Sequence, residues 1–386
     1  MSTSPRPKRS RQGPLTLWHM LTVRQALQWA ALRPQLHWSK AFKIFLLPGM
    51  TVFNSVMRAG ERLIYGRQVR DFQLQQSPLF IIGHWRSGTT LLHNLIAQDP
   101  QLGYPTMYQA AFCNHFLLTQ EVMSRLTGPF MPKTRPMDNL PAGWDIPQEE
   151  DIAIAILSLI SPYVLAADPD RPEIASRFWD LKQLTPEELQ RWRSIYVEYL
   201  KRVTLKDPQR RRLVLKSPVN TLRIPILLDL FPDAHFVHIY RNPADVYRSC
   251  LHLRQTLFGE NCLGRPHMRH LEEQVFERHL FGFETYRRDR ELIPAGRLHE
   301  IRFEELEIDP IGQLEQTYTA LGLSGWDNLR SILEPQVPAL KRYKKNAFPD
   351  NPQRMQMIYD RLRPIFEYYN YPQPEKPRPQ ETVGDS

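Results

Sequence analysis

The sequence predicts an α/β protein in which helices cover both faces of a parallel β-sheet. The first observation behind this prediction is that short apolar runs alternate with longer segments of helical spacing. Such alternation is typical of parallel sheets whose crossover connections are helices. Four runs are expected to form the strands: Leu79 to Ile82, Leu213 to Leu215, His235 to Tyr240 and Leu298 to Phe303.

The second observation is the loop that follows the first of these strands. Gly83 and Gly88 bracket the loop, and apolar residues from Leu91 to Ile96 continue it at helical spacing. A strand, a glycine-bounded loop and a helix in this order point backbone N–H groups at one anion. Nucleoside-triphosphate loops carry Lys directly after the second glycine, but here Thr89 takes that place and the cation comes earlier, at Arg86. The sheet is therefore expected to be P-loop-like.

Composition divides the chain into four parts. Residues 1–13 are rich in Ser, Pro and basic residues and residues 373–386 in Pro and polar residues, so both tails are expected to be disordered. Residues 14–75 are expected to be an amphipathic helical segment. Residues 76–372 form the main domain, in which the long loop from Gly128 to Pro147 and the helices around it are expected to cover the substrate.

The basic character of the chain is confined to its N-terminal segment. The formal net charge is +9, and residues 1–60 hold nine basic residues but no Asp or Glu. Two helical stretches there, Pro14 to Leu32 and Trp38 to about Met57 (interrupted at Pro48-Gly49), could lie on an anionic membrane surface. They could also pack on their own domain, line the mouth of a substrate pocket, or belong to a transit peptide. The rest of the chain is close to neutral, so no nucleic-acid partner is expected.

Cysteine usage and hydropathy indicate a cytoplasmic protein with at most peripheral membrane contact. The three cysteines, Cys113, Cys250 and Cys262, have no metal or redox spacing, which argues against a zinc site or a disulfide framework. No segment approaches about 18 uninterrupted apolar residues, the length that a spanning helix needs. The N-terminus also lacks the compact apolar run of a secretory signal.

Cationic groups follow three of the four predicted strands. Arg86 lies in the loop after the first strand, Lys216 follows the second and Arg241 the third. In an open parallel sheet, ligands bind beyond the carboxyl ends of the strands. Three cations at one edge of one sheet predict a ligand with several anionic groups.

The same segments resemble the sulfotransferases that use 3′-phosphoadenylyl sulfate. The run from Arg86 to Thr90, Arg-Ser-Gly-Thr-Thr, matches their 5′-phosphosulfate loop, [KR]-S-G-T-T. The strand that ends in Arg241-Asn-Pro, with Ser249 eight residues after the Arg, resembles their 3′-phosphate segment. Lys216-Ser-Pro is similar to a Lys-x-Pro segment of the tyrosylprotein, carbohydrate and related bacterial enzymes. A fourth match, from Ile301 to Pro310, has Phe303 where the family has Tyr, and the resemblance spans about residues 78–325.

The resemblance implies a sulfotransferase domain over residues 76–372, a 3′-phosphoadenylyl sulfate (PAPS) co-substrate and no metal. Backbone amides of Ser87, Gly88, Thr89 and Thr90 would hold the 5′-phosphate, and Arg241 and Ser249 the 3′-phosphate. Arg86 and Lys216 would stabilise charge during transfer, because the reaction needs positioning and charge stabilisation more than covalent help. Lys344 and Lys345 would close over the nucleotide, or else form a solvated charged turn.

The general base is the part of the family pattern that this sequence lacks. The tyrosylprotein enzymes place a Glu about twenty residues after the loop cation, whereas Gly103 to Tyr108 contains no carboxylate. Candidates are Glu149, Glu150 and Asp151, which follow the long loop, although acids in a first helical turn are also favoured by the helix dipole. His84 and His93 near the loop are expected to be structural or to gate the pocket.

The leading interpretation is a sulfotransferase acting on a hydroxyl or amine of a small molecule, lipid or carbohydrate. A small-molecule kinase on the same sheet is an alternative, but it needs a Lys in the second half of the loop and a metal-holding Asp at a strand end. A catalytically silent protein that binds a nucleotide and a membrane is a second alternative. The sequence does not separate a lipid acceptor from a sugar.

Overall fold

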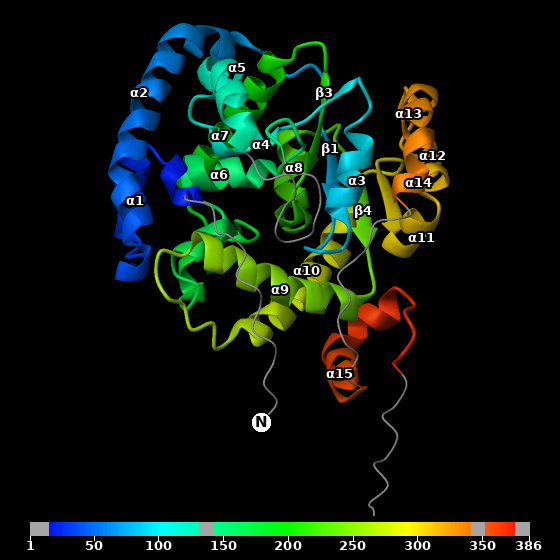
Figure 1. Cartoon of the computed structure of the whole chain (residues 1–386). Coiled ribbons are helices and arrows are strands. Elements are labelled where there is room, and N and C mark those ends of the chain that lie inside the picture. The colour runs from blue at the N-terminus through cyan, green and yellow to red at the C-terminus, as the bar shows by residue number, and fades with distance from the viewer. Residues whose placement is uncertain (1–14, 131–142, 341–351, 375–386) are drawn as a thin grey trace, which may run out of the picture.

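The computed structural model describes residues 15–130, 143–340 and 352–374, and its centre is a parallel sheet of five strands (Figure 1). The strands lie in the order β2-β3-β1-β4-β5. Their bounds are β1 Leu79–Ile82, β2 Leu102–Gly103, β3 Arg212–Lys216, β4 His235–Tyr240 and β5 Leu298–Arg302. The four predicted strands and their parallel arrangement are confirmed.

The strand β2 was not predicted. It has only two residues, Leu102 and Gly103, which pair with the start of β3 at the edge of the sheet. So short a strand has no period of its own in the sequence. The chain passes from β1 to β3 on one side and later to β4 on the other, so the loop after β1 lies at the point where the strand order reverses.

Each face of the sheet is buried against helices. Leu79 and Ile81 of β1 point into a core formed with α3 and α12, whereas Phe80 and Ile82 point into the larger core on the opposite face. All four residues are fully buried, as expected for a strand of continuous apolar residues in a parallel sheet. The helices of the main domain that precede β4 are α3 Thr89–Ile96, α4 Met107–Ala111, α5 Phe116–Thr127, α6 Glu150–Ser158, α7 Pro186–Lys206 and α8 Ile224–Leu230. Those that follow β4 are α9 Pro243–Asn261, α10 Leu271–Asp289, α11 Phe303–Ile308, α12 Pro310–Ala320, α13 Trp326–Leu333, α14 Val337–Leu340 and α15 Pro352–Tyr368.

The N-terminal segment folds as helices along one edge of the molecule (Figure 1). It consists of the 3-10 turns η1 Leu17–Met20 and η2 Trp38–Lys40 and the helices α1 Val23–Ala31 and α2 Ala41–Asp71. The predicted interruption at Pro48-Gly49 was wrong, because α2 continues through Pro48. The helix is held on both sides of the proline: Lys43 contacts the backbone of α9, and the Asn54 amide donates to the carbonyls of His19 and Leu21.

Four predictions fall partly or wholly outside the described residues. These concern the tail at 1–13, most of the tail at 373–386, Lys344 and Lys345, and residues 131–142 of the predicted covering loop. Within the described ranges, no helix is long and apolar enough to cross a membrane.

Candidate active site

The loop after β1 is held in place by its glycines. Gly83 has a φ of +146°, and a Cβ atom at this position would lie 2.4 Å from the Ile239 carbonyl oxygen of β4. The Gly83 N–H donates to the Thr221 hydroxyl oxygen at 2.8 Å, and that hydroxyl donates back to the Gly83 carbonyl. The loop therefore begins in close contact with β4 and with the turn after β3.

Gly88 closes the loop and precedes α3 as its N-cap. Its φ is +106°, and a Cβ here would lie 2.2 Å from the Phe303 ring. Arg86 also adopts a left-handed conformation, with a φ of +70°, which is costly for a residue with a side chain. Such backbone geometry turns successive N–H groups toward one point and is found in anion-binding loops.

The Arg86 side chain joins the loop to α9. Its Nε–H donates to the Ser249 hydroxyl oxygen at 2.8 Å, across 163 residues of sequence. The structure thus brings together a residue predicted to stabilise charge during transfer and a residue predicted to bind the 3′-phosphate. Arg86 therefore links the predicted 5′-phosphate loop to the helix of the predicted 3′-phosphate segment.

Arg241 lies at the end of β4, over the ring of Phe303. The guanidinium carbon is 4.4 Å from the ring centroid, and a terminal nitrogen is 3.5 Å from an Asp245 carboxylate oxygen. The Arg241 Nε is buried and has no hydrogen-bond partner among the described residues. Asn242 caps α9, since its side chain accepts from the Ala244 N–H at 3.0 Å. A buried guanidinium with an unused donor is well suited to a phosphate.

Lys216 completes the row of cations at the end of β3. Its neighbour on β1 is Ile81, the residue next to the end of that strand, so Lys216 lies beside the start of the loop. Its ammonium group forms a 2.6 Å ion pair with Glu149, and the Tyr163 hydroxyl donates to the other oxygen of the same carboxylate. Burial, and then the Glu149 carboxylate, raise the pKa of Tyr163 well above its ordinary value, so the phenol stays protonated and acts as a donor.

Comparisons with known proteins identify the family of this chain. The profile of the sulfotransferase family matches residues 78–328. The chain belongs to the sulfotransferase family. Two curated relatives, the omega-hydroxy-beta-dihydromenaquinone-9 sulfotransferases Stf3 of Mycobacterium tuberculosis and Mycobacterium bovis, are each 31% identical over 366 residues, which cover 94% of this chain and 92% of the relative.

Solved structures show the same fold at lower sequence identity. The sulfotransferase STF9 from Mycobacterium avium aligns with a TM-score of 0.62 at 16% identity, covering 85% of this chain and 86% of that protein. The sulfotransferase STF1 from Mycobacterium tuberculosis aligns with a TM-score of 0.51 at 17% identity and covers 84% of this chain and 85% of that one. The α/β class predicted from the sequence is therefore shared with this family.

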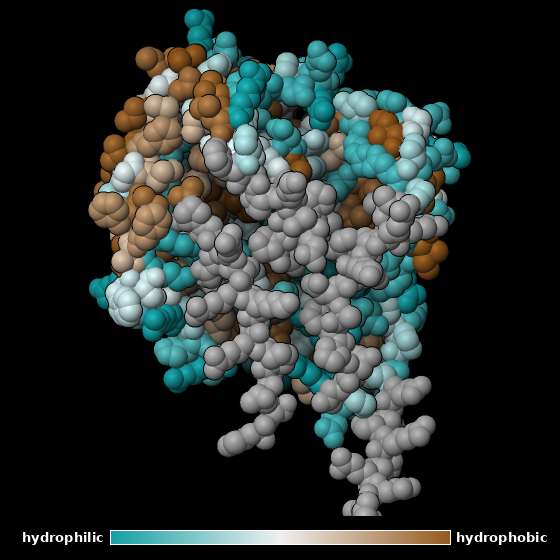
Figure 2. Space-filling model, viewed as in Figure 1, coloured by the Kyte–Doolittle hydropathy of each residue, from teal (hydrophilic) through white to brown (hydrophobic). Residues whose placement is uncertain are grey.

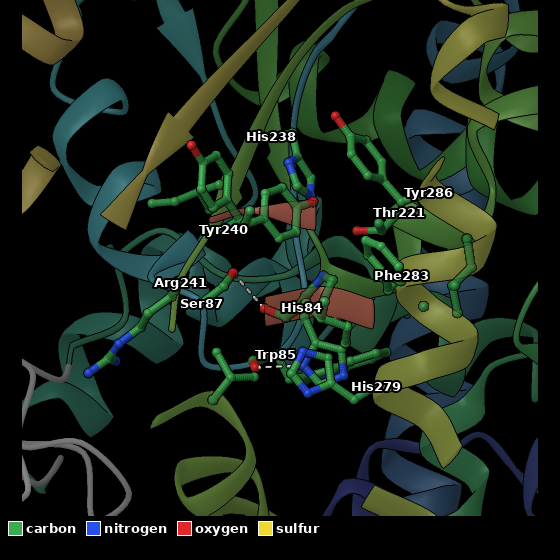
Figure 3. Close-up of a pocket in the computed structure, with 17 residues that line it drawn as sticks. His84, Trp85, Ser87, Thr221, His238, Tyr240, Arg241, His279, Phe283 and Tyr286 are labelled. Carbon is green, nitrogen blue, oxygen red and sulfur yellow. Dashed lines mark hydrogen bonds between the residues drawn. The ribbon is translucent and has the colours of Figure 1, made fainter. Parts of the chain in front are cut away.

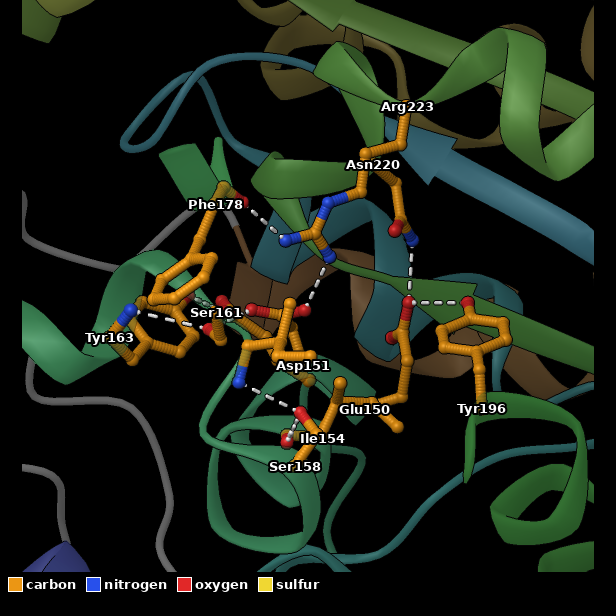
Figure 4. A network of polar contacts seen from close by, with 12 residues as sticks. Glu150, Asp151, Ile154, Ser158, Ser161, Tyr163, Phe178, Tyr196, Asn220 and Arg223 are labelled. Carbon is orange, nitrogen blue, oxygen red and sulfur yellow. Dashed lines mark hydrogen bonds and ion pairs between the residues drawn. The ribbon is translucent and has the colours of Figure 1, made fainter. Parts of the chain in front are cut away.

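The three candidate carboxylates of this sulfotransferase have different surroundings, and Figure 4 shows those of Glu150 and Asp151. Glu149 forms its ion pair with Lys216. Glu150 is fully buried and accepts hydrogen bonds from Asn220 and Tyr196. Burial raises the pKa of Glu150 to about 7. Asp151 forms a 2.7 Å ion pair with Arg223, which is also fully buried. Glu150 and Asp151 thus face the core, away from the row of cations.

Histidines of the sulfotransferase line a cavity behind the loop (Figure 3). The rings of His84 and His279 stack with centroids 4.2 Å apart, and His238 lies on the opposite side of the cavity. Burial lowers the pKa of His84 to about 4. His93 is fully buried on α3, and burial lowers its pKa to about 3. Both predicted histidines are therefore neutral near pH 7.

Two contributors to the site were not expected from the sequence. Tyr163 follows a helical run and carries no local signal, since its contact with Glu149 arises only from the turn after α6. Thr221 holds Gly83 from a 3-10 turn after β3. Lys344 and Lys345 lie outside the described residues, so their predicted contact with the nucleotide stays a prediction. No cluster of three or more potential metal ligands occurs within the described ranges.

Proposed function

We propose that this sulfotransferase takes its sulfuryl group from PAPS and transfers it to a hydroxyl or amine of a lipid-like acceptor. The observation that carries the donor assignment is the contact between Arg86 and Ser249, with Arg241 beside them. It joins the loop that would hold a 5′-phosphate to the strand and helix that would hold a 3′-phosphate. A nucleotide with phosphates at both positions matches this spacing of cations and N–H donors.

Each loop residue has a role in this proposal. The N–H groups of Ser87, Gly88, Thr89 and Thr90 lie in the loop and the first turn of α3, where the partial positive charge of the helix favours the 5′-phosphate. Arg241 would bind the 3′-phosphate with its guanidinium fork, together with the Ser249 hydroxyl.

Arg86 and Lys216 would stabilise charge on the transferred group and on the leaving phosphate. Both are positioned before the reaction starts, by a hydrogen bond to Ser249 and an ion pair with Glu149 respectively. Lys216 is almost completely buried, and cations in water-poor sites stabilise developing charge more strongly than exposed ones.

Glu149 is the proposed general base. It is the one carboxylate of the three candidates that contacts a cation of the site. As a new bond forms between the acceptor oxygen and sulfur, and the bond from sulfur to the phosphate oxygen breaks, Glu149 would take the acceptor proton. Tyr163 and Lys216 hold the two oxygens of Glu149 from different directions and so fix the orientation of the carboxylate.

The proposed acceptor is a hydroxyl on a long apolar molecule. The curated relatives are named for a hydroxylated dihydromenaquinone, and the similarity covers nearly the whole of both chains. We also propose that the enzyme works in the cytoplasm as a peripheral membrane protein. Its three cysteines are unpaired thiols, which fits a reducing compartment.

The alternatives have less support. A small-molecule kinase would need a Lys where Thr89 stands and an Asp to hold metal where β4 ends in Arg241. A silent nucleotide-binding protein would not need Lys216, Glu149 and Tyr163 arranged at the sheet edge. Turnover with labelled donor separates this last alternative from an enzyme.

Thermal melting with adenosine 3′,5′-bisphosphate tests the donor site. A ligand at about 100 times its Kd stabilises the folded state by roughly 2.7 kcal/mol, which is readily measured. We expect the bisphosphate to raise the melting temperature of the wild type more than AMP or ATP with magnesium, and the Arg241→Ala variant to lose the shift. A larger shift with ATP and magnesium, or no shift with any nucleotide, would overturn the proposed donor.

A further inference from the structure

The helix α2 has an inverted distribution of polar and apolar residues. The residues that it buries most completely are polar apart from Val69, namely Lys43, Thr51, Asn54 and Glu61, while Ile44, Leu47 and Tyr65 pack half-buried against the core. Glu61 forms an ion pair with Arg202 inside the protein, and Asn54 bonds the carbonyls of His19 and Leu21. A surface helix normally buries its apolar face and exposes its polar one.

The exposed side of α2 carries a continuous apolar stripe. Its members recur at intervals of three, four and seven residues, which return to the same side of a helix, or lie beside that line: Phe42, Phe45, Val52, Phe53, Val56, Leu63 and Ile64. The side chains of Phe45 and Leu63 are 81% and 88% exposed. Figure 2 shows hydrophobic residues gathered along the edge that α2 and α1 occupy in Figure 1. Apolar side chains aligned over several turns are not the scattered exposure of an ordinary surface.

The exposed apolar surface extends beyond the N-terminal end of α2 onto neighbouring elements. Trp38 precedes α2 and is 78% exposed, and Leu27 of α1 and Leu36 of the connecting turn are exposed as well. Tryptophan is common where a protein meets the boundary between lipid and water, since its ring is apolar but carries an N–H group.

The charges around the stripe are positive. Arg67 and Arg70 are exposed and continue the three-and-four spacing from Leu63, so the apolar line ends in two cations. Arg24 and Arg62 are also exposed, and residues 1–60 contain no carboxylate side chain. On α2 itself, Glu61 is buried, and Asp71, the last residue, forms an exposed ion pair with Arg67 at 3.6 Å, so Arg67 is partly balanced and Arg70 is not.

We propose that the stripe of α2 docks flat on an anionic lipid bilayer, with its arginines on lipid phosphates. An apolar line edged by cations and free of exposed carboxylates over most of its length matches the acyl and phosphate layers of such a surface. A second copy of this chain on the same stripe is the alternative occupant, and it is distinguished from lipid by the oligomeric state of the protein in solution.

The N-terminal segment connects the proposed docking surface to the helix that carries part of the donor site. The Trp18 indole N–H donates to the Asn261 carbonyl at 2.8 Å, and Lys40 and Lys43 donate to the carbonyls of Gly259 and Glu260. These carbonyls form the C-terminal end of α9, where cations are favoured by the helix dipole. The same helix carries Ser249 near its other end, so one rigid element connects the docking surface to the site. Delivery of a membrane-borne acceptor rests on the proposed function, whereas docking itself does not.

Sedimentation with sucrose-loaded vesicles tests the docking. The full-length protein is mixed with phosphatidylcholine vesicles that contain no, 25% or 50% phosphatidylglycerol, at low and high salt. We expect binding at least tenfold stronger to the anionic vesicles and weaker in high salt. The double variant Phe45→Asp/Leu63→Asp is expected to partition onto the vesicles at least tenfold more weakly than the wild type. The double variant Arg67→Gln/Arg70→Gln is expected to partition about fivefold more weakly for each charge removed.

Matched controls separate the stripe from general surface effects. Ile308→Asp removes an equally exposed apolar residue on α11, and Arg361→Gln/Arg363→Gln removes two cations from α15; both should bind vesicles as the wild type does. The proposal would be overturned if Phe45→Asp/Leu63→Asp bound vesicles as well as the wild type, or if the wild type did not bind them. A dimer in sedimentation equilibrium that Phe45→Asp/Leu63→Asp converts to monomers would overturn it as well. Bisphosphate binding is measured on the same samples without lipid, so a failure of the donor site is recognised independently.

Discussion

The ammonium nitrogen of Lys216 lies 2.6 Å from a carboxylate oxygen of Glu149, although 67 residues separate them in the chain. Lys216 ends β3, and Glu149 is the N-cap of α6. The Lys216 side chain is 2% exposed and the Glu149 side chain 16% exposed, so the pair lies at the margin of the core and not in bulk solvent. A cation and a proton acceptor thus meet beside the loop that carries Arg86.

Replacement of Glu149 should separate turnover from donor binding. We expect Glu149→Gln to lower kcat by about 10²–10⁴, which is the usual contribution of a general base. The affinity for adenosine 3′,5′-bisphosphate should change little, because the proposed nucleotide contacts come from Arg86, Arg241 and Ser249. Labelled-donor turnover and calorimetry on the same preparation measure the two quantities.

Glu150→Gln is the matched control for that experiment. It is the neighbouring residue and the same chemical change, but its side chain faces Asn220 and Tyr196 in the core. It should retain near wild-type turnover. If both variants lose activity equally, or if Glu149→Gln retains it, Glu149 is not the base.

The close approach of Gly88 to Phe303 predicts a strict requirement for glycine. In Gly88→Ala, the new methyl would lie 2.2 Å from the Phe303 ring at a φ of +106°. The overlap and the unfavourable φ should lower the free energy of unfolding by roughly 1–3 kcal/mol and weaken bisphosphate binding. Urea denaturation and calorimetry measure the two effects.

Gly66→Ala provides the comparison for this variant. Gly66 lies within α2, and no atom comes within 4 Å of the position that its Cβ would take. Alanine there should stabilise the protein by about 0.5–1 kcal/mol, because alanine favours helices more than glycine does. Wild-type stability and binding in Gly88→Ala would show that the loop does not pack against Phe303 as described.

The sequence was most informative where one residue pattern determined the local structure. The β1 strand and the loop to Gly88 follow from strand length and glycine spacing, and both were placed correctly. The two-residue strand β2 and the course of α2 through Pro48 depend on tertiary partners, so local rules missed them.

The choice among the three carboxylates also depends on tertiary partners. Successive residues at a helix start point in directions about 100° apart, so Glu149, Glu150 and Asp151 meet different neighbours. Lys216 and Arg223, which distinguish them, come from segments more than 60 residues away. Composition alone showed three acids in a first helical turn and could not rank them.

Glu150 should make stability depend on pH. Burial raises the pKa of Glu150 from 4.5 to about 7, so between these values the folded state holds the proton more tightly than the unfolded chain. The contribution of Glu150 to the free energy of unfolding is therefore fully present below about pH 4.5. It is lost as the pH rises toward and through 7, by up to about 1.4 kcal/mol per pH unit. Glu150→Gln should remove this decline, so denaturant midpoints of variant and wild type should diverge from pH 5 to 8. Parallel midpoints across that range would contradict the assignment.

The buried ion pair of Asp151 and Arg223 should be costly to break from one side. Asp151→Asn leaves the Arg223 guanidinium without its charge partner in a fully buried position, and such a change typically destabilises by about 3–5 kcal/mol. In contrast, Asp229→Asn removes the partner of Arg193 at a largely exposed pair and should cost less than about 1 kcal/mol. Urea denaturation at pH 7 measures both variants.

The double variant Asp151→Leu/Arg223→Met tests the cause of the loss. If the unpaired charge is responsible, removal of both charges should recover most of the stability that Asp151→Asn loses, because the buried charge itself is gone. Since Asp151 is two residues from Glu149, the recovered protein should also regain the orientation of α6 and therefore its turnover. Recovered stability without turnover would mean that the ion pair, and not merely the packing around it, positions the proposed base.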